Sequence, residues 1–185
     1  MKKFALATLL ALVAVTASAV EVRVEGADAD GKNGSPNQNI YELSVKESIN
    51  KNFAGDLTVN QSRTEGTHAL ANRTEAGVTA STSYAGSTPY ARVAIGQKFI
   101  NNQNSFGYYS IEPGVSVPVA TTGATVSLGY RFREAFNDNN ADTTRTWRAK
   151  LGYDINSTNN VYVGYDRERG DTQQNITKVG YIHAF

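Results

Sequence analysis

The sequence has 185 residues, a formal net charge of +1 and a mean hydropathy of −0.40. A chain this close to neutral has no overall field to attract nucleic acid, which excludes nucleic acid as a partner. It contains no cysteine, so a core, a metal or a membrane must hold an exported chain of this kind in place of disulfides.

Residues 1–19 are predicted to be a secretory signal peptide. Two lysines precede an apolar run that begins at Phe4, and the small residues Ala17, Ser18 and Ala19 form a cleavage motif. The apolar run is shorter than the roughly 20 residues that a bilayer-spanning helix needs. We therefore expect cleavage after Ala19, which leaves residues 20–185 as the exported domain.

From Val20 onward, apolar and polar residues alternate with the period of two that is typical of a β-strand. Ten alternating segments are separated by connections rich in turn residues: 26–39, 50–55, 64–71, 85–89, 100–105, 118–123, 136–144, 156–159 and 170–174. Pro113 cannot donate to a β-ladder, so we expect a bulge or another irregularity in the sixth segment. The pattern predicts an all-β, antiparallel up-and-down transmembrane β-barrel of ten strands, with eight or twelve strands as alternatives.

The lengths of the connections agree with an even number of strands. Bacterial barrels have short periplasmic turns and longer outer loops. The second, fourth, sixth and eighth connections are short, and the longest one, 26–39, is expected at the outer surface.

Aromatic residues should gather at the two membrane interfaces of such a barrel. Strand direction places an outer group and an inner group on the apolar face: Tyr41, Phe99, Tyr109, Phe132, Trp147 and Tyr165 outside, and Phe53, Tyr84, Tyr153 and Phe185 inside. A soluble β-sandwich would show the same alternation but has no reason to sort aromatics by strand direction. The sorting favours the barrel.

The polar face of the strands is expected to line the lumen. The fifth, seventh and eighth segments supply a basic lining of Arg92, Lys98, Arg131, Arg133, Arg148 and Lys150. The predicted acidic lining is Glu112, Asp154, Asp166 and Glu168. One side of the lumen would then be basic and able to pair with anions.

Two interpretations of this lumen follow from the residues. A narrow pore and a lumen filled by ion pairs both fit ten strands, because eight strands leave room only for side chains. In either case Lys178 should lie among acids, with Glu21, Glu25, Asp166 and Glu168 as the candidates.

Several short motifs resemble the oligogalacturonate-specific monomeric porin family. The most specific is Ser110-Ile111-Glu112-Pro113-Gly114-Val115-Ser116, and VSLGYRFREAF at 126–136 also matches. The resemblance implies an arginine-lined pore that passes acidic oligosaccharides, and it carries that role to Arg92, Arg131, Arg133 and Arg148. This chain is shorter, with room for ten strands where the family has twelve.

Two function hypotheses result. The first is a narrow channel in the outer membrane for small or acidic solutes; the second is a closed barrel that acts through its loops at 26–39 and 136–144.

We expect a monomer in outer-membrane lipid, assembled by machinery that reads the last strand through Tyr181 and Phe185. Neither His68 nor His183 can be paired with a nucleophile, so we predict no enzyme activity, no catalytic residue, no metal site and no cofactor.

Overall fold

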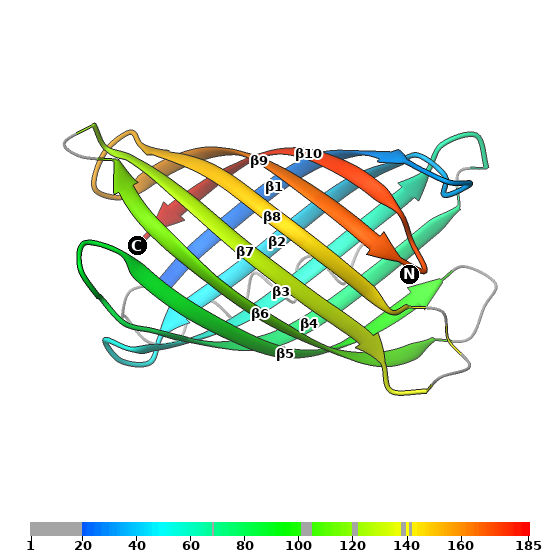
Figure 1. The fold of residues 1–185 in the computed structure, drawn as a ribbon, viewed down its shortest axis with the longest axis horizontal. Coiled ribbons are helices and arrows are strands. Elements are labelled where there is room, and N and C mark those ends of the chain that lie inside the picture. The colour runs from blue at the N-terminus through cyan, green and yellow to red at the C-terminus, as the bar shows by residue number, and fades with distance from the viewer. Residues whose placement is uncertain (1–19, 68, 101–104, 120–121, 138–139, 141) are drawn as a thin grey trace.

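Ten β-strands form the regular structure of the protein, and each is antiparallel to the next along the chain (Figure 1). The computed structural model describes residues 20–67, 69–100, 105–119, 122–137, 140 and 142–185. The predicted signal peptide and His68 lie outside the described residues. The strands are β1 (Val20–Gly31), β2 (Gln38–Ser48), β3 (Phe53–Thr64), β4 (Leu70–Ser81), β5 (Thr88–Ile100), β6 (Phe106–Val119), β7 (Ala124–Ala135), β8 (Thr144–Asp154), β9 (Asn159–Gly170) and β10 (Gln174–Ala184).

The sheet closes on itself because β1 pairs with both β2 and β10. Glu25 lies opposite Glu42 on one side and opposite Gly180 on the other. Closure leaves no sheet edge with unpaired backbone groups. The prediction of a ten-stranded antiparallel barrel is confirmed. In the part of the chain that is described, no helix is long and apolar enough to cross a membrane.

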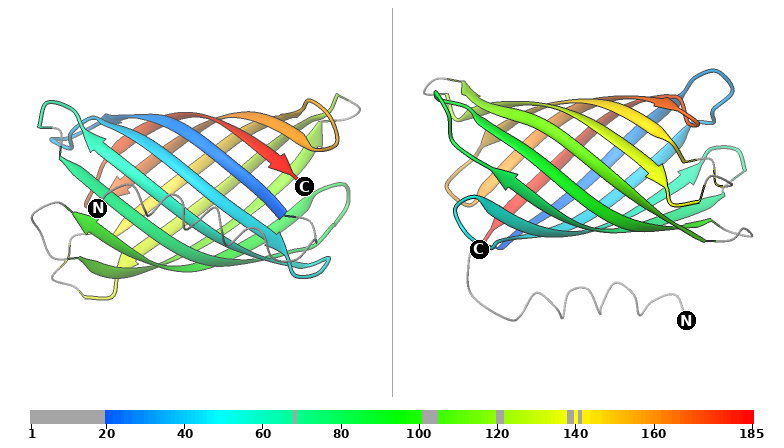
Figure 2. Two further views of the ribbon diagram at one scale, coloured as in Figure 1. Left: turned by 180° about the vertical axis from the view of Figure 1, so that it is seen from behind. Right: turned by 60° about the horizontal axis from the view of Figure 1, so that its bottom comes forward.

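Both termini of the barrel lie at one end, together with the connections after β2, β4, β6 and β8 (Figures 1 and 2). We call this the terminal end. The connections after the odd-numbered strands lie at the opposite end, which we call the loop end. Six aromatic residues lie toward the loop end and four toward the terminal end, each as its strand direction predicted: Tyr41, Phe99, Tyr109, Phe132, Trp147 and Tyr165, then Phe53, Tyr84, Tyr153 and Phe185.

The first loop is shorter than the sequence indicated. The expected connection 26–39 is mostly strand, since β1 continues to Gly31 and β2 begins at Gln38. Asp28 lies opposite both Asn39 and Thr177 in the sheet. Asp28 and Asp30 are exposed on the outward face of β1, whereas Ala29 is buried on its inward face. The apolar-out, polar-in alternation is therefore reversed in this stretch, which is why it was expected to be a loop. The longest connection is instead 136–143, between β7 and β8.

Pro113 interrupts the ladder without adding a residue. Ile111 lies opposite Phe132 and Gly114 opposite Gly129, so the register between β6 and β7 is the same on both sides of Pro113. The irregularity is a local loss of pairing with β7, while Pro113 still lies opposite Ala91 of β5. A bulge is not formed.

The distribution of side chains is inside out compared with a soluble protein. Apolar residues in mid-strand, such as Ile95 and Leu128, are exposed on the outer surface, with 61% and 54% of their area accessible. Charged residues are buried inside, and Arg133 is only 1% exposed. This is the arrangement of a barrel that meets lipid on its outside, and it excludes the sandwich.

Tyrosine rings fill part of the interior by lying over glycines of neighbouring strands. A Cβ atom added at Gly96 would lie 2.4 Å from the ring of Tyr108, and one at Gly180 would lie 2.3 Å from the ring of Tyr162. The hydroxyl of Tyr162 donates a hydrogen bond to Glu25 at 2.6 Å, which fixes the ring in place. These inward glycines therefore give the large rings room to cross the lumen.

The substitution Gly180→Ala is predicted to destabilise the barrel. The added methyl group displaces the Tyr162 ring, and overpacking of this kind costs about 1–3 kcal/mol. The free energy of unfolding in urea, measured on protein refolded into lipid vesicles, checks the effect. Gly26→Ala is the control, because nothing lies within 4 Å of a Cβ atom added there. Equal stability of the two variants would contradict this packing.

Candidate functional site

The lumen holds the charged residues that the strand periodicity directed inward. Nine of the ten predicted lining residues face it with side chains that are buried or half-buried: Arg92, Lys98, Arg131, Arg133, Arg148, Lys150, Glu112, Asp166 and Glu168. The tenth, Asp154, is exposed at the terminal end, where it accepts a hydrogen bond from the amide of Asn160 at 2.7 Å. Asp154 is thus a rim residue.

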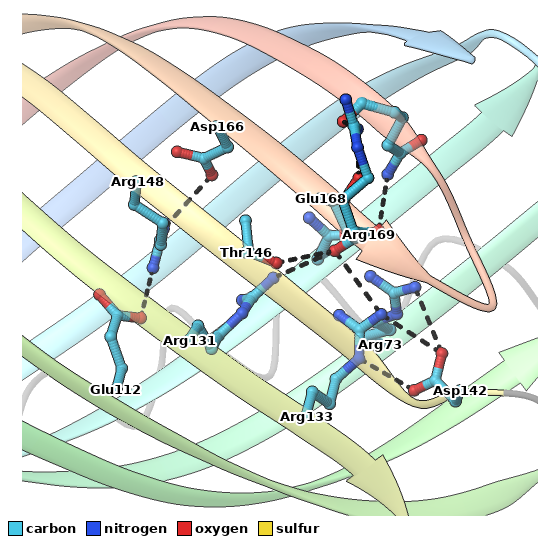
Figure 3. Close-up of polar contacts among 12 residues, drawn as sticks. Arg73, Glu112, Arg131, Arg133, Asp142, Thr146, Arg148, Asp166, Glu168 and Arg169 are labelled. Atoms are coloured by element: carbon cyan, nitrogen blue, oxygen red, sulfur yellow. Dashed lines mark hydrogen bonds and ion pairs between the residues drawn. The ribbon is translucent and has the colours of Figure 1, made fainter. Parts of the chain in front are cut away.

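A first ion-pair cluster crosses the middle of the barrel. Arg148 of β8 lies 2.6 Å from Glu112 of β6 and 3.3 Å from Asp166 of β9 (Figure 3). Lys178 of β10 lies 2.9 Å from Asp166 and 3.7 Å from Glu25. The expectation that Lys178 lies among lumen acids is confirmed for two of its four candidates.

Arg92 forms a second cluster on the opposite wall. Its guanidinium donates hydrogen bonds to Asp56 of β3 at 2.9 and 2.5 Å and to Glu75 of β4 at 2.5 Å. All three side chains are largely buried. Arg92 thereby links three adjacent strands through one side chain.

A third group, which we call the loop-end cluster, is built around Asp142. This residue belongs to the connection between β7 and β8, yet its side chain is completely buried. It lies 3.0 Å from Arg133 and 3.9 Å from Arg73 (Figure 3). It also lies 2.7 Å from Lys98. A single carboxylate from a loop thus meets three cations from β4, β5 and β7.

Glu168 extends the loop-end cluster along β9. It lies 3.7 Å from Arg131 and 3.9 Å from Arg133, and it accepts a hydrogen bond from Thr146 at 3.2 Å. The cluster therefore holds four cations, Arg73, Lys98, Arg131 and Arg133, against two carboxylates, Asp142 and Glu168.

Asp142 was missed by sequence reasoning, which placed it in the loop 136–144 and not in the lumen. The signal that points to it is the excess of cations on the fifth, seventh and eighth strands, because buried cations need partners. Burial raises the pKa of the Asp142 carboxyl, but Arg133, Arg73 and Lys98 together lower it below its ordinary value of 3.8. Asp142 is therefore ionised at neutral pH.

The expected basic side of the lumen is not present as a continuous surface. Five of the six predicted cations, Arg92, Lys98, Arg131, Arg133 and Arg148, pair with carboxylates of other strands or with Asp142. Lys150 forms no ion pair with any described residue, and its ammonium lies 5.1 Å from the Tyr162 ring centroid. The alternation along a strand shows which residues face inward, but it does not show which carboxylates meet them across the lumen. The prediction of a basic side was therefore wrong.

A cavity of about 330 Å³ occupies the lumen on the side of the terminal end. It is lined near the rim by Glu21 and Lys46, which are about two-fifths exposed, and farther in by Arg131, Arg148 and Lys150. A smaller pocket of about 60 Å³ adjoins the loop-end cluster. The open space thus narrows from the terminal end toward Asp142.

The two residues predicted to guide assembly lie at the terminal end. The hydroxyl of Tyr181 is hydrogen-bonded to the side-chain oxygen of Asn159. Phe185 is 75% exposed, and its backbone N–H donates to the carbonyl of Val20 at 2.9 Å. Their role in assembly stays a prediction.

Comparison with known proteins gives likeness in fold but no family. No protein-family model matches the chain, and no curated protein matches it. An outer membrane channel of the COG4313 group from Pseudomonas putida F1 is similar, with a TM-score of 0.57 and 8% identity over 93% of this chain and 97% of that one. The β domain of the Bordetella autotransporter BrkA has a TM-score of 0.53 and 10% identity over 91% and 100% of the two chains.

A KdgM porin structure also matches, with a TM-score of 0.48 and 11% identity over 91% of this chain and 99% of that one. At these identities the likeness concerns the barrel fold alone.

The substitution Arg92→Gln is predicted to cost about 3–5 kcal/mol of stability, because it leaves Asp56 and Glu75 buried without their cation. Urea unfolding in lipid vesicles measures this loss. The control is Lys46→Gln, whose partner Glu21 lies 3.4 Å away at the exposed rim. A pair of that kind contributes about 0–1 kcal/mol. A similar loss in both variants would show that Arg92 is not a structural link.

Asp142 also predicts how stability depends on pH. A carboxyl whose pKa is lower in the folded state stabilises the protein above its unfolded pKa of about 3.9, and this contribution is lost as the pH falls through the folded pKa. We expect Asp142→Asn to cost about 3–5 kcal/mol at neutral pH and to flatten the fall in stability below pH ~4. Unfolding curves over this pH range test it, with Asp154→Asn as the control. Parallel pH profiles for the wild type and Asp142→Asn would contradict the assignment.

Proposed function

We propose that the protein is a porin-like barrel of the bacterial outer membrane that passes small anionic solutes. Three features support its place in a bilayer: a closed sheet, an apolar exterior and aromatic residues grouped toward both ends. The similar fold of an outer membrane channel agrees with this proposal. In the same proposal, residues 1–19 direct export and are cleaved, assembly machinery reads the last strand, and the barrel is a monomer in lipid.

The shape of the lumen carries the proposal of a channel. The cavity of about 330 Å³ reaches the rim of the terminal end, and a pocket of only about 60 Å³ adjoins the loop-end cluster. In this proposal the loop-end cluster is the narrowest level of the passage. Because four cations face two carboxylates there, the narrowest level has an excess of positive charge. Such a ring of charge favours anions over cations.

The size of the solute follows from the same geometry. Ten strands leave little free cross-section, and most arginines in this lumen already have carboxylate partners. The resemblance of residues 110–116 to the oligogalacturonate porins points to acidic oligosaccharides. The narrow lumen favours short acidic molecules within that class.

A closed barrel is the second candidate, and one observation favours it. Asp142, Thr144 and Thr146 have no exposed surface, so side chains close the loop end in the described conformation. The part of this hypothesis that relied on a long loop at 26–39 is weaker, because only 32–37 connects β1 and β2.

Conductance in a planar lipid bilayer separates the two candidates. We expect the refolded wild type to show small unitary currents with a preference for anions. Asp142→Asn removes a negative charge from the narrowest level, so the ratio of anion to cation permeability should rise.

Asp154→Asn removes the same charge at the rim and should leave that ratio nearly unchanged. No resolvable current from the wild type would refute the channel and favour the closed barrel.

A further inference from the structure

A cluster of three arginines lies on the outer surface of the barrel near its loop end. Arg145 of β8 and Arg167 of β9 are exposed, whereas the residues on either side of each are buried toward the lumen. Arg169 follows on the same face of β9. Across the two strands, Arg145 lies opposite Arg169, and Arg167 lies opposite Trp147. We call these three residues the outer arginine cluster.

The positive charge of this cluster is not balanced by the protein. Arg145 and Arg167 form no ion pair or hydrogen bond with any residue in the described ranges. Arg169 donates to the backbone carbonyls of Glu168 at 2.6 Å and Gln174 at 3.4 Å, which are neutral acceptors. Like charges directly opposite each other in a sheet are destabilising, so an anion bound between them would stabilise this surface.

Nearby carboxylates on this side of the barrel bind elsewhere. Glu134 of β7 accepts a hydrogen bond from the hydroxyl of Tyr109. Asp171 accepts one from the backbone N–H of Thr143 at 2.7 Å. Neither carboxylate forms an ion pair with an arginine of the cluster, so an anion in direct contact with these arginines would come from outside the described part of the chain.

An apolar aromatic surface borders the cluster on the side of the membrane centre. Trp147 is 67% exposed, and Tyr165 on the next strand is about half exposed. The Trp147 ring packs edge-on against Tyr130, with 4.9 Å between the ring centroids. Phe132 lies opposite Arg145 in the sheet. Cations directly beyond an aromatic girdle lie at the level where lipid headgroups meet the hydrocarbon.

We propose that the outer arginine cluster binds the phosphate of a phosphorylated lipid, whose acyl chains lie against the surface around Trp147. Planar guanidinium groups donate paired hydrogen bonds to phosphate oxygens, which makes arginine well suited to this headgroup. The adjoining apolar surface favours a lipid over a free phosphate, because only a lipid fills both parts of the site. This inference rests on the membrane placement proposed above, but not on conduction through the lumen.

Trp147 is the only tryptophan of the chain, so its fluorescence reports directly on this surface. The full chain is refolded into phosphatidylcholine vesicles that contain an equal fraction of a brominated lipid, either phosphatidylcholine or phosphatidic acid. Bromine on the acyl chains quenches tryptophan on contact. Brominated phosphatidic acid should quench Trp147 more strongly than brominated phosphatidylcholine, because its phosphate is held by the arginines.

The variants test the arginines individually. Arg167→Gln should lower the relative binding constant of phosphatidic acid roughly fivefold, and adding Arg145→Gln should lower it further. Lys51→Gln is the matched control, because it removes one positive charge from an exposed connection at the opposite end and should change nothing. Equal quenching by brominated phosphatidylcholine in all variants shows that they have inserted.

Four results would overturn the proposal. Equal quenching by the two lipids in the wild type, or a preference kept by the double variant, would remove the lipid site while leaving the membrane placement intact. Quenching by neither lipid would refute the membrane placement and the lipid site together. Loss of the preference at a concentration of inorganic phosphate no higher than that of the phosphatidic acid would show that the apolar surface adds nothing to binding, and would assign the cluster to free phosphate.

Discussion

The need to pair every charge inside a narrow barrel governs this structure. A side chain on the inward face can reach neither lipid nor much water, so a cation there is stable only beside a carboxylate. Consecutive inward residues on one strand are two positions apart, whereas inward residues of neighbouring strands lie side by side. The carboxylate partner of an inward cation therefore comes from another strand. Arg92 joins β3, β4 and β5, and Arg148 joins β6, β8 and β9. Charge pairing thus connects the wall across the lumen as well as along the ladders.

The same constraint explains why a loop takes part in the interior. Strands β4, β5 and β7 bring Arg73, Lys98 and Arg133 to one level, and those strands supply no acid beside them at that level. Asp142 from the connection between β7 and β8 supplies it. One loop residue therefore both completes the packing and sets the charge at the narrowest point. On the outside, the arginines near Trp147 lack such a partner, and we assign that role to lipid.

Much of the fold follows from the sequence because a period of two needs no knowledge of distant residues. Strand number, inward and outward faces and the sorting of aromatics were predicted in this way. The predictions that were wrong depended on which residues lie close together in the folded barrel. Polar residues on the outward face and alanines on the inward face of 26–31 hid the end of β1, and the partners of Arg131 and Arg133 lie on other elements. Asp142 carries no local signal, because a buried aspartate and a solvated one look alike in a loop sequence.

Thiol accessibility tests the central claim, which is a charged lumen that is open toward the terminal end and constricted at the loop-end cluster. The chain has no cysteine, so single substitutions report cleanly. Ser116→Cys lines the larger cavity, Thr146→Cys lies at the fully buried level of the loop-end cluster, and Val117→Cys faces outward. With a small anionic thiol reagent and vesicle-inserted protein, we predict fast reaction at position 116 and slow reaction at 146 and 117. Equal rates at 116 and 146, or fastest reaction at 117, would contradict the account.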